Sequence, residues 1–308
     1  MTTAKADHHR EQFPLPKGIR AIWTLPDESL DGLWDSIIID DETKKRLLSQ
    51  AVLNFTVRGK VDRSVLPLHG VILLVGPPGT GKTSLARGLG HRVAKAFRGS
   101  RFRLLEVEPH ALTSAAMGKT QRAVTELFSQ SIAESASDGP MVVLLDEVET
   151  LAADRSKLSL EANPVDVHRA TDAVLVQLDA LADQHPNLLF VATSNFPAAV
   201  DSAFTSRCDL VLEIPLPDRD ACSRILADCL TGLGRTYPSI SKLTKTADFA
   251  HCAAECVGLD GRAIRKMVSN ALASSPETAM NPETVTLPDL LAAAKAAKKA
   301  RSHGGLQR

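Results

Sequence analysis

Residues 71–85 read VILLVGPPGTGKTSL, and this stretch decides the class of fold. The continuous apolar run 71–75 predicts a buried strand, and it leads directly into the spacing GxxxxGK[ST] over residues 76–83. In a phosphate-binding loop the glycines let backbone N–H groups converge on phosphate oxygens, and the N-terminus of the next helix adds a favourable potential. A simple glycine-rich turn would not need this strand–loop–helix context, so we expect a nucleotide site here.

The last two residues of the GxxxxGK[ST] pattern each have an expected role. Lys82 is expected to reach the β- and γ-phosphates of ATP, and the Thr83 hydroxyl is expected to ligate Mg²⁺. The residues expected to bind the nucleotide are Gly76, Pro77, Pro78, Gly79, Thr80, Gly81, Lys82, Thr83 and Ser84.

A second Gly-Lys-Thr triplet, at 118–120, fails the same test. Thr113 stands where the spacing requires the first glycine, and no strand runs directly into the triplet. We therefore expect no phosphate binding by Lys119. The triplet is interpreted as a chance recurrence at the start of a helix, with Thr120 as the N-cap.

The acidic partner of the phosphate loop is expected at 141–147, MVVLLDE. The apolar residues predict a strand whose carboxyl end presents two carboxylates, at the edge where ligands bind in open α/β sheets. Asp146 is expected to hold Mg²⁺ through water, and Glu147 to act as general base on the attacking water. The alternative is that the two carboxylates only cap the following helix. Together with the phosphate loop they predict an ATPase.

Four further apolar runs alternate with segments of helical periodicity, at 102–107, 141–146, 188–194 and 210–215. Short, nearly continuous runs suit strands that are covered by helices on both faces. With 71–75 they predict an α/β fold built on a five-stranded parallel sheet with flanking helices.

The chain is expected to contain three parts. Residues 1–32 form a short, proline-punctuated lead-in, 33–217 the α/β nucleotide-binding domain, and 218–308 a small all-helical domain with a basic tail. The second boundary is placed where strand-like runs stop and Ala/Leu-rich segments begin. A helix is expected over 41–57.

Composition narrows the class of protein. Lys plus Arg and Asp plus Glu both number 36 in the 308 residues, so the formal net charge is zero, which argues against a protein that covers nucleic acid. No apolar run is long enough to span a membrane and the N-terminus lacks a signal core, so a soluble, cytoplasmic protein is expected. The five cysteines are expected to be reduced thiols. A metal site at Cys252 and Cys256 is the weaker alternative, because no further ligand lies at a suitable spacing.

The order of these motifs resembles the AAA+ ATPases and, within them, the pachytene-checkpoint ATPases that remodel HORMA-domain proteins. A strand that ends in Asn195 is followed, about a dozen residues on, by an arginine. The matching stretches are LWDSIIIDDETKKRLL (33–48), GPPGTGKTSLARGL (76–89), LLEVEPHALTS (104–114), LLDEVETLAADR (144–155), AVLVQLDAL (173–181), ATSNFPAAVDSAFTSRCD (192–209) and GLDGRAIRKM (258–267).

The resemblance implies roles for further residues. Asn195 matches sensor 1, which orients the lytic water with the catalytic glutamate; the alternative is an asparagine that only satisfies backbone groups at the strand end. Arg207 matches the arginine finger that reaches the nucleotide of the neighbouring subunit; the alternative is a surface salt bridge. Arg262 matches sensor 2, which contacts the γ-phosphate from the small domain. Ile38 and Ile39 match the segment that lines the adenine pocket, although a plain core role suits them nearly as well.

The resemblance also implies a homo-hexameric ring that pulls on a HORMA-domain partner through pore loops. Ala116 and Met117 occupy the position where the family usually has an aromatic–apolar pair that grips the substrate, so the aromatic residue is missing here. Met117 is apolar and flexible, so it could still wedge against an extended peptide; the alternative is that it packs at a helix cap. A second pore loop is expected within 154–168.

With only about thirty residues ahead of the matching segment, the chain resembles compact bacterial members, which are associated with HORMA-regulated nucleotidyltransferase signalling in antiphage defence. No membrane partner is expected. The alternative functions are an AAA+ nucleic-acid motor or clamp loader, with the KAAKKAR tail as its basic contact, and a nucleotide switch that does no mechanical work. The neutral net charge disfavours nucleic acid as a partner.

Overall fold

The computed structural model describes residues 15–112, 119–154 and 164–304, which form two compact units. The first unit contains the described residues of Met1–Ser36, Asp40–Gly76 and Lys82–Ile214. The second contains Ile37–Ile39, Pro77–Gly81 and the described part of Pro215–Arg308.

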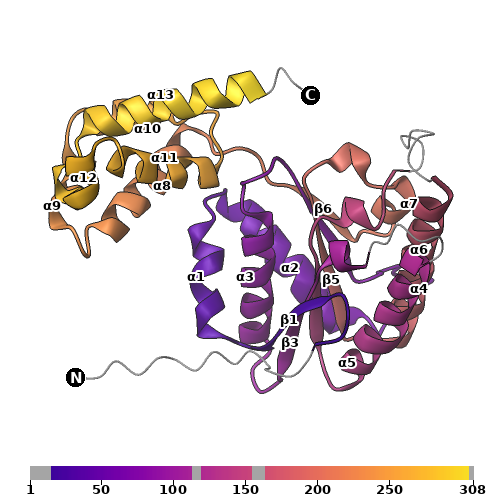
Figure 1. The fold of residues 1–308 in the computed structure, drawn as a ribbon. Helices are drawn as coiled ribbons and strands as arrows, with labels where there is room; N and C mark the ends of the chain where they lie inside the picture. Colours follow the sequence, from indigo (N-terminus) through magenta and orange to yellow (C-terminus); the bar gives the residue numbers. More distant parts are fainter. Residues whose placement is uncertain (1–14, 113–118, 155–163, 305–308) are drawn as a thin grey trace. The chain divides into compact units, whose positions relative to one another are not determined.

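The first unit is built on a six-stranded sheet in the order β1-β3-β4-β5-β2-β6 (Figure 1). Its strands are β1 (Ile19–Leu25), β2 (Val71–Val75), β3 (Phe102–Val107), β4 (Met141–Leu145), β5 (Leu188–Ser194) and β6 (Leu210–Glu213). β2 to β6 pair only in parallel among themselves, which confirms the predicted five-stranded parallel sheet. β2, β4 and β5 are buried along their whole length, as expected of strands covered on both faces.

The sixth strand was not predicted. β1 pairs antiparallel with β3, with Ile22 opposite Leu105, and the helix α1 (Glu28–Ser36) follows it, so the segment interpreted as a lead-in contains a strand and begins a helix. Its burial alternates only at the start, with Ala21 and Ile22 buried and Arg20 exposed, which is a weak pattern for an edge strand. β1 forms because it pairs with β3, which is distant in sequence, and the local sequence does not reveal such a pairing.

Helices cover both faces of the sheet (Figure 1). One face carries α1, α2 (Asp41–Val57) and α3 (Lys82–Ala96), and the other carries α4 (Lys119–Glu126), a π-helical turn η2 (Leu127–Ile132), α5 (Ala133–Ser137) and α6 (Pro164–Gln184). α2 has the predicted bounds, and Asp40 caps it by accepting a hydrogen bond from the Thr43 N–H. α4 already includes Lys119, so Thr120 lies in the first turn of this helix. The prediction that Thr120 is the N-cap was therefore wrong by at least one residue.

Short turns follow the carboxyl ends of the strands. They are η1 (Pro109–Ala111) after β3, η3 (Val148–Thr150) after β4, and η5 (Pro197–Ala199) with α7 (Ser202–Thr205) after β5. Because β2 to β6 are parallel, these turns gather side chains from distant parts of the sequence at one edge of the sheet.

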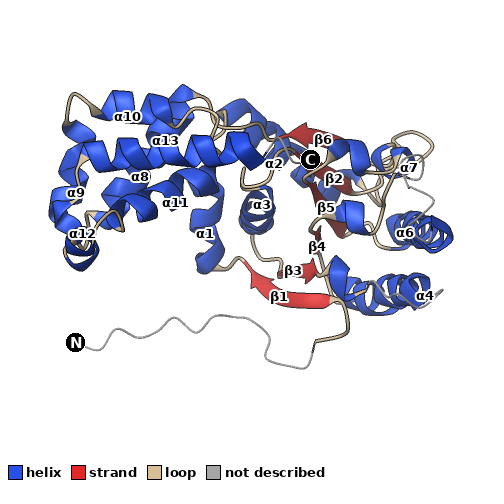
Figure 2. Cartoon of the chain, turned by 45° about the horizontal axis from the view of Figure 1, so that its top comes forward, coloured by secondary structure: helices blue, strands red, loops and turns tan. Residues whose placement is uncertain are grey.

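The second unit is helical, as Figure 2 shows. It contains α8 (Arg219–Leu233), α9 (Pro238–Lys242), η6 (Leu243–Lys245), α10 (Phe249–Glu255), α11 (Gly261–Leu272), α12 (Pro276–Met280), η7 (Pro282–Thr284) and α13 (Leu287–Gly304). Buried Leu226, Ile264, Met267 and Leu290 form part of its core. Asp218 and Asp260 cap α8 and α11 with their side chains. Within the described chain, no helix combines the length and apolar character that a membrane span requires.

Candidate nucleotide site

The phosphate loop joins the last residue of β2 to the first residue of α3, as its sequence predicted. Gly76 has a φ of 146°, and its N–H donates to the carbonyl oxygen of Ser194 over 3.2 Å. A Cβ atom at Gly76 would overlap with the carbonyl oxygen of Ile214, so only glycine fits this position. Backbone constraint, rather than side-chain chemistry, therefore sets the start of the loop.

Lys82 lies at the base of this loop and is 5% exposed. Its Nζ donates to the carbonyl oxygen of Gly76 over 2.8 Å, so the loop's own backbone holds the ammonium group. A buried ammonium needs partners, and an incoming phosphate would be a stronger one than a carbonyl group. The contact keeps the charge in place for an anion bound by the loop.

Replacing Lys82 with alanine is expected to weaken ATP binding by at least about a hundredfold, because a desolvated charge-assisted contact to phosphate is lost. Lys119→Ala, in the second Gly-Lys-Thr triplet, serves as the matched control and is expected to bind ATP like the parent. Equilibrium titration with a fluorescent ATP analogue measures both. Equal losses in the two variants would contradict our reading of the two triplets.

Asp146 receives two hydroxyl groups from different elements. The Thr83 hydroxyl, at the start of α3, donates to Asp146 Oδ1 over 2.8 Å, and the Thr193 hydroxyl, on β5, donates to the same oxygen over 2.5 Å. Hydroxyl and carboxylate oxygens are the ligands that magnesium prefers, so Thr83 and Asp146 fit a Mg²⁺ site. Among the described residues no three or more His, Cys, Asp or Glu side chains form a metal cluster.

Glu147 is held in an unusual backbone conformation. Its φ is 52°, which makes it the one non-glycine residue with a positive φ in the described chain. Such a conformation costs about 1–3 kcal/mol in a residue of this kind and is most frequent at functional sites. The Glu147 N–H donates to the Thr193 hydroxyl over 3.1 Å, so the same threonine supports both acidic residues.

Two side chains contact the Glu147 carboxylate. Asn195 Nδ2 donates to Oε1 over 3.2 Å, and His110 Nε2 lies 3.1 Å from Oε2. The Asn195 backbone is fixed in turn, because its N–H donates to Glu149 Oε1 over 3.1 Å. The structure thus brings Asn195, predicted as sensor 1, to the predicted general base.

Sequence reasoning missed Thr193, His110 and Glu149. Thr193 is a buried hydroxyl one residue before the end of β5, and polar residues at that edge of a parallel sheet were the available signal. His110 and Glu149 lie in the turns η1 and η3, and no motif spacing marks them.

Arg207 forms a bidentate ion pair with a residue outside this group. Its Nε and Nη2 donate to the two carboxylate oxygens of Asp179 on α6, over 2.8 and 2.7 Å. The guanidinium group holds the pKa of Asp179 below its usual range, and the carboxylate raises the pKa of Arg207. Both groups therefore remain charged throughout the neutral range.

In the second unit, the exposed Arg262 is the second residue of α11, and its N–H donates to the carbonyl oxygen of Gly79 over 3.3 Å. Ile38 is buried with the helical core and Ile39 is partly buried, so their adenine role remains a prediction. Ala116, Met117 and most of 154–168 lie outside the described residues.

All five cysteines are free, and burial raises the pKa of the Cys252 and Cys256 thiols to about 11 and about 12.

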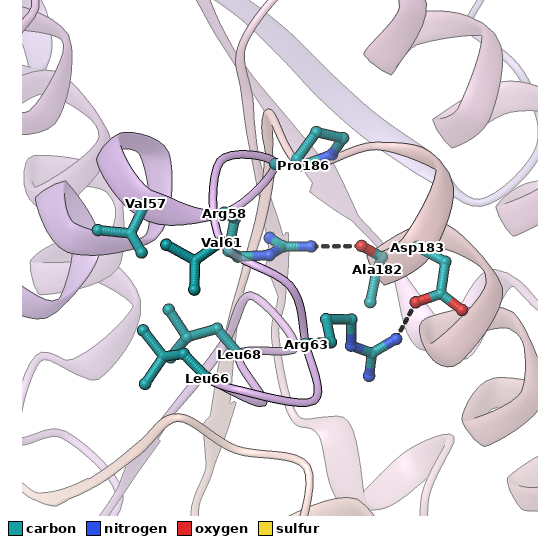
Figure 3. Close-up of a pocket in the computed structure, with 10 residues that line it drawn as sticks. Val57, Arg58, Val61, Arg63, Leu66, Leu68, Ala182, Asp183 and Pro186 are labelled. Atoms are coloured by element: carbon teal, nitrogen blue, oxygen red, sulfur yellow. Dashed lines mark hydrogen bonds and ion pairs between the residues drawn. The ribbon is translucent and has the colours of Figure 1, made fainter.

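A separate cavity of about 140 Å³ lies between the C-terminal parts of α2 and α6 (Figure 3). Buried Arg58 crosses it and donates to the carbonyl oxygens of Leu188 and Ala182, over 2.5 and 3.0 Å. Burial lowers the pKa of Arg58 to about 10. Because Leu188 begins β5, this cavity lies at the opposite edge of the sheet from the phosphate loop and is no part of the nucleotide site.

Comparison with known proteins finds one family and several relatives. Residues 72–216 match the model of the ATPase family associated with various cellular activities (AAA). The chain is 70% identical to CD-NTase-associated protein 6 of Pseudomonas aeruginosa over 96% of this chain and 97% of that protein. It is 35% identical to a pachytene checkpoint protein 2 homolog of Oryza sativa subsp. indica over 82% of this chain, but the match spans only 60% of that relative.

Two solved structures have a similar fold. The structure of C. elegans PCH-2 matches with a TM-score of 0.73 and 29% identity, over 95% of this chain and 77% of that one. A chain from the E. coli MS115-1 HORMA:CdnC:Trip13 complex matches with a TM-score of 0.70 over 90% of this chain and 94% of that one. Identity to that chain is 18%, so this match shows a shared fold.

Proposed function

Because the chain belongs to the AAA ATPases, in the group that contains CD-NTase-associated protein 6 and pachytene checkpoint protein 2, we propose that it couples ATP hydrolysis to the remodeling of a HORMA-domain protein. The observation that carries the ATPase part is the constellation around Glu147: a carboxylate fixed by Asn195 next to the Asp146–Thr83 pair. Support for the partner comes from the CD-NTase association in the name of the relative and from the HORMA-containing complex of similar fold.

The phosphate loop would bind the triphosphate, with Lys82 exchanging the Gly76 carbonyl for phosphate oxygens. Thr83 and Asp146 would hold a magnesium ion, directly and through water respectively. When bound, that ion neutralises negative charge on the β- and γ-phosphates. The Thr193 hydroxyl keeps Asp146 in the orientation that this role needs.

Glu147 is placed to accept a proton. A water molecule beside the carboxylate would lose its proton to Glu147 as its oxygen attacks the γ-phosphorus, and the bond to the ADP oxygen would break. Asn195 holds one carboxylate oxygen and orients the water. We assign Arg207 to the nucleotide of the neighbouring subunit and Arg262 to the γ-phosphate in its own subunit, on the strength of the motifs they match.

A site completed by a neighbouring copy requires a repeated head-to-tail interface, and the proposed assembly is a closed homo-hexamer. Turnover around this ring would pull on a HORMA-domain partner held by the loop that contains Ala116 and Met117. We further propose that this remodeling switches off HORMA-activated signalling in antiphage defence.

A trapping experiment tests the partner. Glu147→Gln, which should bind ATP without releasing it as ADP, is mixed with purified HORMA-domain protein, with double-stranded DNA or with a sliding clamp, and the retained component is identified after gel filtration. ATP-dependent retention of the HORMA-domain protein supports the proposal. Retention of DNA or clamp alone would instead indicate a nucleic-acid motor or clamp loader.

Met117→Asp is expected to abolish substrate remodeling while basal ATP turnover stays within about twofold of the parent, because a charged side chain cannot wedge against an apolar peptide. Remodeling is followed as ATP-dependent protease sensitivity of the HORMA-domain protein. Val65→Asp, at an apolar position that is 75% exposed elsewhere in the first unit, is the matched control. Remodeling that survives in Met117→Asp would remove Met117 from the gripping loop.

A further inference from the structure

The side chain of Arg207 is fixed within its own subunit. Besides the two bonds to Asp179, its Nη1 donates to the carbonyl oxygen of Ala203 over 2.8 Å. Only 25% of the Arg207 side chain is exposed. A guanidinium group carries five N–H donors, so these three bonds leave two donors for another acceptor.

Asp179 is itself rigidly placed. It belongs to α6, and its neighbours Leu175, Leu178 and Leu181 are buried in the main core of the first unit. His69 Nε2 lies 3.9 Å from Asp179 Oδ1, the oxygen that also accepts from Arg207 Nε. The position of the carboxylate therefore fixes the plane of the guanidinium group that is paired with it.

We infer that Asp179 is a positioning residue for ATP hydrolysis: it holds the guanidinium group of Arg207 in the orientation in which the two free donors can meet the γ-phosphate in the neighbouring copy. This inference rests on the proposed function, in which Arg207 completes the neighbour's site. The contact through Nε and Nη2 fixes the plane of the group and leaves one Nη2 donor pointing away from the carboxylate.

The reason for such a support is the length of the arginine side chain. An arginine at a subunit surface loses rotamer entropy when it is ordered, and an ion pair formed in advance removes that cost from the reaction. A donor that is misplaced by about 1 Å costs on the order of a hundredfold in rate. Asp179 would thus act on the rate in the next subunit without touching its nucleotide.

Asp179→Ala is expected to lower kcat for ATP at least about tenfold and to leave KM within about twofold, because substrate binding does not depend on the finger's orientation. Asp183→Ala is the matched control. Asp183 lies one turn further along α6 and pairs with Arg63 (Figure 3), so this variant removes a carboxylate from the same helix without touching Arg207. Its kcat is expected to stay within about twofold of the parent.

A double variant separates positioning from a structural role. If Asp179 acts through Arg207, then Asp179→Ala adds no further loss to Arg207→Ala, whereas independent effects multiply. Asp179→Asn, which keeps the shape and one acceptor oxygen, is expected to retain more turnover than Asp179→Ala, and its ATP binding checks that the fold is intact.

Three results would overturn the inference alone: parental kcat in Asp179→Ala, a higher kcat (which would mean that the pair restrains the finger), or multiplied losses in the double variant. Parental turnover in Arg207→Ala would overturn the finger itself. A parent chain without turnover would overturn the proposed function, and the inference with it.

Discussion

Glu147→Gln should bind ATP with parental affinity and hydrolyse it at least about a hundredfold more slowly. The amide is nearly isosteric with the carboxylate, and its oxygen can still accept the hydrogen bond that Asn195 Nδ2 gives to Oε1. It cannot take a proton from water at neutral pH, so the step that Glu147 would perform is lost while the geometry of the site remains.

Single-turnover hydrolysis and equilibrium binding of ATP measure the two expectations separately. Glu134→Gln, at an exposed glutamate on α5, is the matched control for the loss of one negative charge and should behave like the parent. Turnover in Glu147→Gln within tenfold of the parent would require another base, and His110, 3.1 Å from Glu147 Oε2, would be the first candidate.

The parts of the fold that the sequence predicted are those with strong local signals. The runs at 71–75, 102–107 and 188–194 form strands with the predicted bounds, because short and nearly continuous apolar runs are typical of strands that helices cover on both faces. The phosphate loop was predictable for a similar reason: Gly76 needs a backbone conformation and a close approach to Ile214 that only glycine permits.

The contacts that complete the candidate site were beyond reach, because they join residues distant in sequence. Thr193 touches Asp146 from 47 positions away, and His110 touches Glu147 from 37 positions away. Asp179 and Arg207 are 28 positions apart, and a single aspartate on a helix carries no sign of its partner. Parallel strand order brings these groups together, and the order became known only with the structure.

Arg207→Ala should reduce ATP turnover about a thousandfold or more, the effect typical of an arginine that stabilises charge on a transferring phosphoryl group. ATP binding should change little, because Lys82 and the backbone of the loop would hold the phosphates in the subunit's own site. The freed Asp179 carboxylate is 39% exposed and remains near His69, so the fold should tolerate the change.

Mixed rings test whether Arg207 acts in the neighbouring copy. An Arg207→Ala subunit keeps Glu147, and a Glu147→Gln subunit keeps Arg207. A site is therefore complete where an Arg207→Ala subunit binds the ATP and a Glu147→Gln neighbour supplies the arginine; in the reverse order the site lacks both groups. Random mixing of equal amounts should complete roughly a quarter of the sites, and turnover should appear although neither variant is active alone. Lys82→Ala in place of Arg207→Ala is the control, because its own site cannot bind ATP and no complete site forms. Failure to recover turnover at any ratio of Arg207→Ala to Glu147→Gln, with ring assembly confirmed by sedimentation, would confine Arg207 to its ion pair with Asp179.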